Sequence, residues 1–456
     1  MIRTRARRLA TFGTVLGLSS GLVLTGLAAG TAQAGGVPGV TATSITIGAT
    51  VPLTGIASPG YNEVAKAARA VFDYVNSKGG VNHRHINFVL KDDCYGTPAF
   101  GCTGTPNTAQ QTNALLALPV FATVGSLGTP TQDSVRALLK ANHTPQLFVN
   151  SGSKDWNNAA TYPQLFGWQP SYTVESKILA HYILSAPSFK TSGKLDKVCF
   201  LGQNDDFGTD GRIGLGYGKL PVAVTSYYSV TSLVLLGSNY FKSFIHTFQT
   251  DGCKVIFLDT IPGATAAAFK NAHTLGYKPH WVISSVGSDP ITVHNVLGKS
   301  ISPDPEIGAT SFSPLPVSTV KTPWKAWITK VLLKDKTDFP TFKSTTPLDG
   351  NMVYGASWGV LFAEVLYASG KNFTQNSFVN TILTHQFPDT PSLIPLQYTA
   401  SNHQGQVGGL VDTIKSATQT TIVGKGIVYR TDSSSANNVV VSGSKPAGGP
   451  IPPWLS

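Results

Sequence analysis

The sequence predicts an α/β protein with two Rossmann-like lobes, each built on a parallel-type sheet, joined by a hinge. Strand-like and helix-like runs alternate along most of the chain with short connections, a pattern typical of parallel sheets covered by helices. The alternation falls into two blocks of similar size, residues 43–168 and 169–304. At 456 residues the chain is also too long for one ordinary domain. Its 41% of apolar residues allows two large cores.

The first block opens with a strand from Ile45 that runs into the polar loop 52–60, PLTGIASPG. Apolar residues then recur at helical spacing from Val64 to Val75, and Gly79-Gly80 marks the end of that helix. Further strands are predicted at residues 86–90, 120–124 and 145–150, with helices at 108–118 and 131–142. This order predicts a parallel sheet with helices on both faces.

The second block repeats the alternation. Strands are predicted at residues 198–202, 222–228, 254–259 and 281–284, with helices at 172–184, 238–248 and 265–276. Residues 305–400, which contain a long helix at 351–369, are expected to return to the first lobe, because such helices need a sheet to cover. Residues 401–432 are then expected near the hinge or second lobe, and 433–456 as a flexible tail.

Residues 1–34 have the pattern of a signal peptide: a basic start, a Gly- and Ala-rich apolar stretch, and small residues up to Ala34. A transmembrane anchor is the alternative, but the glycines and the cleavage pattern favour export with cleavage near Ala34. No cysteine lies near this site, so no lipid anchor is expected. The formal charge of +11 includes the arginines of this leader, and the remaining basic residues are scattered. We therefore expect no nucleic-acid partner.

Export permits disulfides, and the four cysteines allow three pairings. Cys94 and Cys102 flank a short Gly/Pro loop, while Cys199 and Cys253 each lie at the start of a predicted strand. Two local bridges fit this arrangement best. A zinc site is the alternative, but CxxC spacing and nearby histidines are missing. We expect no metal and no cofactor.

The loops after the strands are the candidate binding residues, because ligands of parallel α/β sheets lie outside the strands' carboxyl ends. Three such loops are GSLGTPTQ (125–132), SGSKDWNN (151–158) and QNDDFGTDG (203–211), and the loop 52–60 is expected to form one wall of a cleft. They carry hydroxyls, amides and glycines, which bind polar groups without proton chemistry. Thr129 could equally serve as a helix cap, and Phe207 as a core aromatic.

Catalytic motifs are missing from the sequence. It contains no GxSxG, GxxxxGK[ST] or GxGxxG motif, and its ten histidines are dispersed. The pairs Asp92-Asp93 and Asp205-Asp206 are neighbours whose side chains diverge. We expect no enzymatic activity. A secreted α/β hydrolase is the alternative, and it would need a nucleophile with a base nearby.

The stretch ITIGATVPLTG…ARAVFDYVNSKGGVNHRHINFVLKDDC resembles the first lobe of type I periplasmic binding proteins, specifically the branched-chain amino-acid (Leu/Ile/Val) binding group of ABC importers. The matching landmarks are Thr54-Gly55, Asp73, Val75, Asn76, Gly79-Gly80-Val81 and Asp92-Asp93. The resemblance extends from about residue 43 to 410. It implies a monomeric Venus-flytrap protein that closes on a small-molecule solute and delivers it to a membrane ABC permease. A ligand-sensing receptor component of the same fold is the alternative.

The resemblance also implies the binding residues. The hydroxyl that meets a ligand carboxylate corresponds to Thr129, next to Ser126 and Gly128, and the aromatic over the ligand corresponds to Phe207. The remaining positions are Ser151, Gly152, Ser153 and Lys154 in the second loop, Thr260, and Val286. Val286 replaces the acidic residue that grips an α-ammonium. An amide, an aromatic acid or another carboxylate is therefore as well supported as an amino acid.

Overall fold

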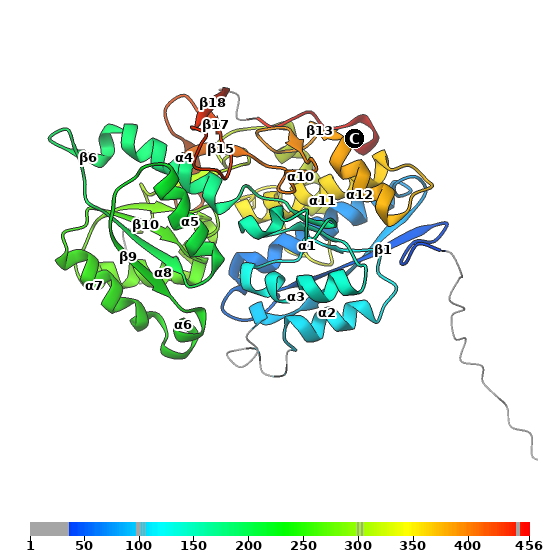
Figure 1. The fold of residues 1–456 in the computed structure, drawn as a ribbon, viewed down its shortest axis with the longest axis horizontal. Coiled ribbons are helices and arrows are strands. Elements are labelled where there is room, and N and C mark those ends of the chain that lie inside the picture. Colours follow the sequence, from blue (N-terminus) through cyan, green and yellow to red (C-terminus); the bar gives the residue numbers. More distant parts are fainter. Residues whose placement is uncertain are drawn as a thin grey trace, which may run out of the picture. The chain divides into compact units, whose positions relative to one another are not determined.

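The computed structural model describes residues 36–96, 102, 104, 106–298, 301, 304–443 and 447–456. The expected signal peptide, residues 1–34, lies outside the described residues. Figure 1 shows two lobes within the described chain: the green segment forms one, and the blue and cyan segments with helices α10, α11 and α12 form the other. None of the described helices is long and apolar enough to cross a membrane.

The first lobe contains a five-stranded sheet with the order β2-β1-β3-β4-β5, and all its neighbouring strands are parallel. The predicted parallel sheet is therefore confirmed. Its strands are β1 (Ser44–Val51), β2 (His85–Asp92), β3 (Thr123–Val124), β4 (Gln146–Val149) and β5 (Leu165–Gly167). Strand β3 is shorter than the predicted strand at residues 120–124.

Among the described residues, six helices belong to this lobe: α1 (Ser58–Ser77), α2 (Thr108–Leu116), α3 (Thr129–Ala141), α10 (Pro323–Lys334), α11 (Gly350–Ala368) and α12 (Gln375–Thr384). The two longest, α1 and α11, pack against each other very closely. A Cβ atom on Gly355 would lie 1.9 Å from the Val64 carbonyl oxygen, and one on Gly359 would lie 3.1 Å from Ala68 Cα. Glycine at these two positions allows the returning helix to reach the first lobe.

The second lobe contains a nine-stranded sheet with the order β18-β17-β15-β12-β11-β10-β8-β9, and β16 also pairs with β15. The strands from β9 to β12 are parallel, and pairing beyond β12 is antiparallel. The strands are β8 (Val198–Gln203), β9 (Val222–Tyr228), β10 (Val255–Asp259), β11 (His280–Ile283), β12 (Thr310–Ser313), β15 (Gly408–Ser416), β16 (Gln419–Ile422), β17 (Val428–Arg430) and β18 (Val440–Gly443). Strand β12 lies beyond the domain boundary at 304 that the sequence suggested, because it pairs with β15, a partner distant in sequence.

The helices of this lobe are α4 (Tyr172–Ser185), α5 (Asp206–Tyr217), α6 (Val230–Leu236), α7 (Lys242–Thr250), α8 (Pro262–Thr274) and α9 (Pro290–Leu297). Short pieces complete the fold: strands β6 (Lys190–Thr191), β7 (Lys194–Leu195), β13 (Gln386–Phe387) and β14 (Leu396–Gln397), and 3₁₀ turns at Cys94–Gly96, Lys154–Asn157, Pro187–Phe189, Ser238–Phe241 and Pro453–Leu455. Three segments cross between the lobes: one after β5, one after β12 and one before β15.

Two local disulfides are present, as the sequence predicted. Cys94 pairs with Cys102, and Cys199 at the start of β8 pairs with Cys253, which lies two residues before the neighbouring strand β10. These bridges use all four cysteines of the chain, so none of them is available for the alternative zinc site.

The end of the chain is packed, which differs from the flexible tail expected from residue 433. The Trp454 ring stacks on Tyr367 of α11 with centroids 5.0 Å apart, and Leu455 is buried. The indole nitrogen of Trp324 donates to the Gly449 carbonyl at 2.7 Å. The polar composition of 433–450 suggested disorder, but the apolar final residues cover a surface formed by α10 and α11, which are distant in sequence.

Candidate binding site

A cavity of about 80 Å³ lies between the lobes. Its walls come from helices α1, α3, α4, α5 and α11, from the first crossing segment, and from the segments that follow β2, β3, β4, β11 and β12. The lining residues are Tyr61, Val64, Tyr95, Leu127, Gly128, Thr129, Asn150, Gln169, Tyr172, Phe207, Ser285, Val286, Pro314, Asn351 and Tyr354. Both lobes therefore contribute to one enclosed site, as a closing two-lobed binding protein requires.

The N-terminus of α3 forms one end of this cavity. Gly128 precedes the helix with φ at +115°, and a Cβ atom there would lie 2.4 Å from Thr131 Oγ1, so this position requires glycine. The Thr129 hydroxyl is buried and lies 2.7 Å from Ser151 Oγ and 3.0 Å from the Tyr172 hydroxyl. Because the first N–H groups of a helix lack intrahelical acceptors, this end of the cavity favours an anionic or polar group.

Two amide side chains in the cavity lining each have one polar atom without a hydrogen-bond partner. Asn150 donates through Nδ2 to the Gly125 carbonyl at 2.8 Å, which leaves its buried Oδ1 without a partner. Gln169 accepts from the Tyr354 hydroxyl at 2.6 Å, which leaves its buried Nε2 without a partner. A buried polar group without a hydrogen bond costs about 1–3 kcal/mol. A ligand that offers an acceptor to Gln169 and a donor to Asn150 would remove both penalties.

Aromatic rings make up much of the remaining wall. The rings of Tyr172 and Phe207 lie with their centroids 4.5 Å apart. Burial raises the pKa of Tyr61, Tyr95, Tyr172 and Tyr354 above the ordinary tyrosine value, so all four are neutral phenols that can donate or accept. Such walls suit a flat or apolar ligand body.

None of the described residues that line this cavity carries a charged side chain. A carboxyl lies behind the wall: Glu175 accepts from the Ser285 backbone N–H at 2.5 Å and from the Ser285 hydroxyl at 2.8 Å. Burial raises the pKa of Glu175 to about 7, against the smaller opposing effect of these hydrogen bonds. Glu175 does not line the cavity, so it offers no direct partner to a ligand ammonium there.

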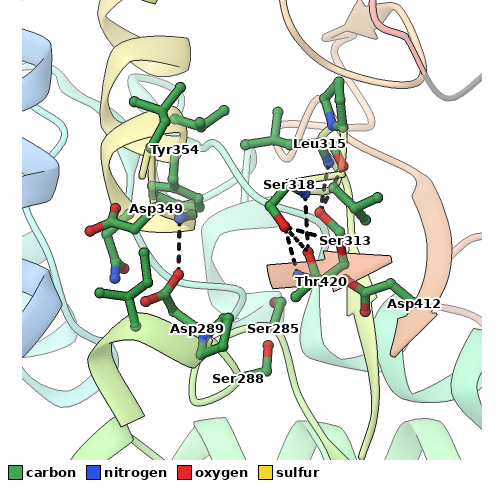
Figure 2. Close-up of a pocket in the computed structure, with 18 of the residues that line it drawn as sticks. Ser285, Ser288, Asp289, Ser313, Leu315, Ser318, Asp349, Tyr354, Asp412 and Thr420 are labelled. Carbon is green, nitrogen blue, oxygen red and sulfur yellow. Dashed lines mark hydrogen bonds between the residues drawn. The ribbon is translucent and has the colours of Figure 1, made fainter. Parts of the chain in front are cut away.

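A second chamber of about 110 Å³ adjoins the cavity and shares Ser285, Pro314, Asn351 and Tyr354 with it. Figure 2 shows the polar character of this chamber. Its acidic residues are Asp289, Asp349 and Asp412, and Lys325 also lines it. Asp289 caps α9 through Thr292 N–H at 2.8 Å and accepts from Gly350 N–H of the first lobe at 2.9 Å.

Several hydrogen bonds join the lobes around the cavity. Lys154 donates to Asp210 of α5 twice, through its backbone N–H at 2.9 Å and through Nζ at 2.6 Å. The Tyr61 hydroxyl donates to the Val286 carbonyl at 3.0 Å, and Asn351 Nδ2 donates to Thr292 Oγ1 at 3.0 Å. The cavity is therefore seen with the lobes closed over it.

The structure brings four residues predicted from the sequence, Gly128, Thr129, Phe207 and Val286, to the cavity wall, and Ser151 contacts this group through Thr129. Gln203 of the third loop donates to the hydroxyl of the lining residue Tyr95 at 3.3 Å.

The other predicted positions have local structural contacts. The Ser126 hydroxyl accepts from Thr50 N–H, Ser153 caps the 3₁₀ turn through Asp155 N–H, and Thr260 bonds to Thr265. Gly152 lies so close to the first crossing segment that a Cβ atom there would be 2.7 Å from the Pro170 carbonyl oxygen. None of these four residues lines the cavity.

The loop 52–60 does not line the cavity either, contrary to the sequence prediction. Asp92 accepts from Leu53 N–H at 3.0 Å and from the Thr54 hydroxyl at 2.5 Å. Gly55 lies against the first disulfide, where a Cβ would be 2.6 Å from both sulfur atoms. The polar groups of the loop are thus used to fix the loop itself, and the first lining residue after it is Tyr61.

Sequence reasoning missed Tyr61, Tyr95, Asn150, Gln169, Tyr172 and Tyr354. Asn150 could have been found, since it ends the predicted strand 145–150 at the carboxyl edge. Tyr354 lies on a helix that is apolar on most sides, where nothing local distinguishes a lining residue from a core residue. Gln169 lies in a crossing segment, whose place depends on both lobes.

The comparisons with known proteins agree with this architecture. Residues 44–418 match the family model described as periplasmic binding protein. A fatty acid ABC transporter substrate-binding protein from Thermomonospora curvata has a similar structure, with a TM-score of 0.71, 18% identity, and coverage of 89% of this chain and 97% of that one. A solute binding protein of an ABC transporter from R. palustris in complex with 4-hydroxybenzoate has a TM-score of 0.67 and 13% identity, over 86% and 98% of the two chains.

A branched chain amino acid ABC transporter structure from Thermus thermophilus with bound valine has a TM-score of 0.65 and 16% identity, over 83% and 95% of the chains. No curated protein matches the sequence. The fold and the interlobe cavity define a two-lobed binding protein of the α/β class. The chain belongs to the periplasmic binding protein family, type I, whose members are exported solute-binding proteins and generally not enzymes.

Proposed function

We propose that this protein is the solute-binding component of an ABC importer and that its solute is a small carboxylic acid with an aromatic or apolar body. The acid group lies at the N-terminus of α3, near Thr129 and the unpaired Nε2 of Gln169. The body lies between the rings of Phe207 and the lining tyrosines. The protein releases the solute unchanged to a permease in the membrane.

The observation that carries this proposal is the set of polar atoms in the lining residues that lack a hydrogen-bond partner. A helix N-terminus and an unpaired amide N–H both favour an acceptor-rich group. The described lining residues offer no carboxylate for an ammonium. Burying an ammonium without an anionic partner costs several kcal/mol. An acid without an α-amine therefore fits better than a free amino acid.

The proteins of similar structure support hydroxybenzoates as the solute among the carboxylic acids. Three of these proteins are known in complex with 4-hydroxybenzoate, 3,4-dihydroxy benzoic acid or valine, and another is a fatty acid ABC transporter substrate-binding protein. Hydroxybenzoates combine a carboxylate, a ring and a hydroxyl donor. These three features match the helix N-terminus, the aromatic wall and the free Oδ1 of Asn150.

The test is a thermal-shift panel on the protein without residues 1–34. The panel contains 4-hydroxybenzoate, its amide, its methyl ester, octanoate and valine. The largest rise in melting temperature is expected with 4-hydroxybenzoate, a smaller one with the amide, and none with valine. Mass spectrometry of the recovered ligand is expected to show the same molecule. A larger shift with valine than with any acid would refute the choice of solute, and a changed ligand mass would refute the binding role.

Export and assembly belong to the same proposal. We expect cleavage near Ala34 and a monomer that binds one solute. N-terminal sequencing of the secreted protein and light scattering after size exclusion check these two points.

A further inference from the structure

Three ionisable side chains converge in the second lobe, outside both the interlobe cavity and the second chamber. His294 lies on α9, while Asp304 and Glu306 lie on the segment that leads into β12. One ligand atom from each residue lies within 4.8 Å of those of the other two. His294 Nδ1 is 2.7 Å from Asp304 Oδ2. The sequence analysis expected no metal, and it considered only the cysteines as ligands.

Glu306 is the unexplained member of this cluster. Its side chain is 0% exposed, and neither carboxylate oxygen has a hydrogen-bond partner. The nearby Asp289 is also a carboxylate, and its oxygens accept from the Thr292 and Gly350 N–H groups, so it offers Glu306 no hydrogen-bond donor. Among the described residues, no lysine or arginine pairs with Glu306.

We propose that His294, Asp304 and Glu306 form a binding site for one divalent transition-metal ion, with zinc as the best fit. A neutral imidazole and two carboxylates carry a charge of −2, which a divalent cation cancels. Imidazole nitrogen favours zinc over calcium or magnesium, which prefer oxygen ligands. The metal supplies the partner that the buried Glu306 oxygens lack.

The three ligand atoms, now within 4.8 Å of one another, must reach tetrahedral spacing to hold the metal. Ligand atoms at about 2.0–2.2 Å from a tetrahedral zinc lie roughly 3.3 Å from each other. His294 Nδ1 and Asp304 Oδ2 must therefore separate by roughly 0.6 Å. The His294 side chain is 41% exposed, so its ring can make this movement and leave the fourth position to water.

The position of the site suggests a structural role. An ion there joins α9 to the segment that leads into β12. The same helix is capped by Asp289, which also accepts the Gly350 N–H of the first lobe. Zinc therefore stiffens the helix that meets the first lobe during closure.

The test is a titration of the metal-free protein, without residues 1–34 and without a polyhistidine tag, with Zn²⁺ alone, followed by calorimetry. His294→Ala and Glu306→Gln are compared with His246→Ala, which removes an exposed histidine of α7 that has no place in the cluster. We expect one zinc per wild-type chain. The Kd should rise at least tenfold in both cluster variants and stay unchanged in His246→Ala.

Thermal melting provides a second readout that does not depend on full occupancy. Zinc is expected to raise the melting temperature of the wild type and of His246→Ala, but not that of Glu306→Gln. Without metal, Glu306→Gln should melt at the same temperature as the wild type or higher, since it removes a buried carboxyl. Absence of stoichiometric zinc binding, equal affinity in Glu306→Gln, or tighter binding of Ca²⁺ than of Zn²⁺ would overturn the proposal.

Discussion

The pair of hydrogen bonds between Lys154 and Asp210 gives the sharpest prediction about closure. Lys154→Met removes the Nζ donor, which lies 2.6 Å from Asp210, and keeps the backbone N–H bond and most of the side-chain volume. The bond joins a loop of the first lobe to α5 of the second, so it forms only when the lobes meet. The variant should therefore weaken solute binding and leave the melting temperature of the unliganded protein unchanged.

The magnitude follows from the exposure of the two side chains. Lys154 is 49% exposed, whereas the Asp210 side chain is 0% exposed. A hydrogen bond to a charged group contributes about 1.5–3 kcal/mol when buried, and an exposed ion pair about 0.2–1 kcal/mol. For this half-exposed pair we expect about 1 kcal/mol. That corresponds to a roughly fivefold rise in Kd, seen mainly as a faster dissociation rate.

The assay is stopped-flow or calorimetric binding of the best acid, with Arg136→Met as the matched control. Arg136 pairs with Asp155 at 2.6 Å and with Asp133 at 3.0 Å, entirely within the first lobe. Its loss should leave the Kd unchanged. Equal affinity of the two variants, or an equal loss in both, would show that the Lys154–Asp210 contact does not report on closure.

Three further predictions concern the cavity, a buried carboxyl and the chain end. Phe207→Ala should weaken acid binding by about 1–3 kcal/mol, roughly fivefold to 150-fold in Kd, whereas Tyr217→Ala at the exposed end of the same helix should not; similar Kd values for the two would remove Phe207 from the site. Glu175→Gln should raise the melting temperature more at pH 8 than at pH 5. Burial raises the folded-state pKa of Glu175 from 4.5 to about 7, so the folded wild type is most stable with Glu175 protonated and loses free energy of unfolding as pH rises from 4.5 through 7. A gain in melting temperature that is independent of pH would contradict this. Removal of residues 447–456 should lower the melting temperature by several degrees in scanning calorimetry, because it strips Tyr367 and the α10 tryptophans of their cover; an unchanged melting temperature would show that this packing adds no stability.

The sequence was most informative where a local pattern has one structural meaning. The parallel sheet of the first lobe followed from alternation and short loops, and the end of α1 at Ser77 followed from Gly79 and Gly80, which have positive φ values. The disulfides followed from the short spacing of one cysteine pair and the strand positions of the other. In each case neighbours along the chain determine the outcome.

Local patterns failed where partners distant in sequence decide. The polar loop 52–60 suggested a ligand wall, but Asp92, far along the chain, takes up its hydrogen bonds. Strand β12 and the packed chain end depend on partners that pair or pack from more than 80 residues away. The unpaired Nε2 of Gln169 could not be predicted, because it depends on the Tyr354 hydroxyl, 185 residues away, which donates to the other end of the same amide.

Equilibrium binding of 4-hydroxybenzoate to the wild type and to Gln169→Glu at pH 8 tests whether Gln169 donates to a bound carboxylate. The substitution keeps the size of the side chain and the acceptor for Tyr354, but it replaces the unpaired donor with an acceptor that repels a carboxylate. We expect one acid bound per wild-type chain and a Kd at least ten times higher in the variant. Equal or tighter acid binding by Gln169→Glu would contradict this expectation.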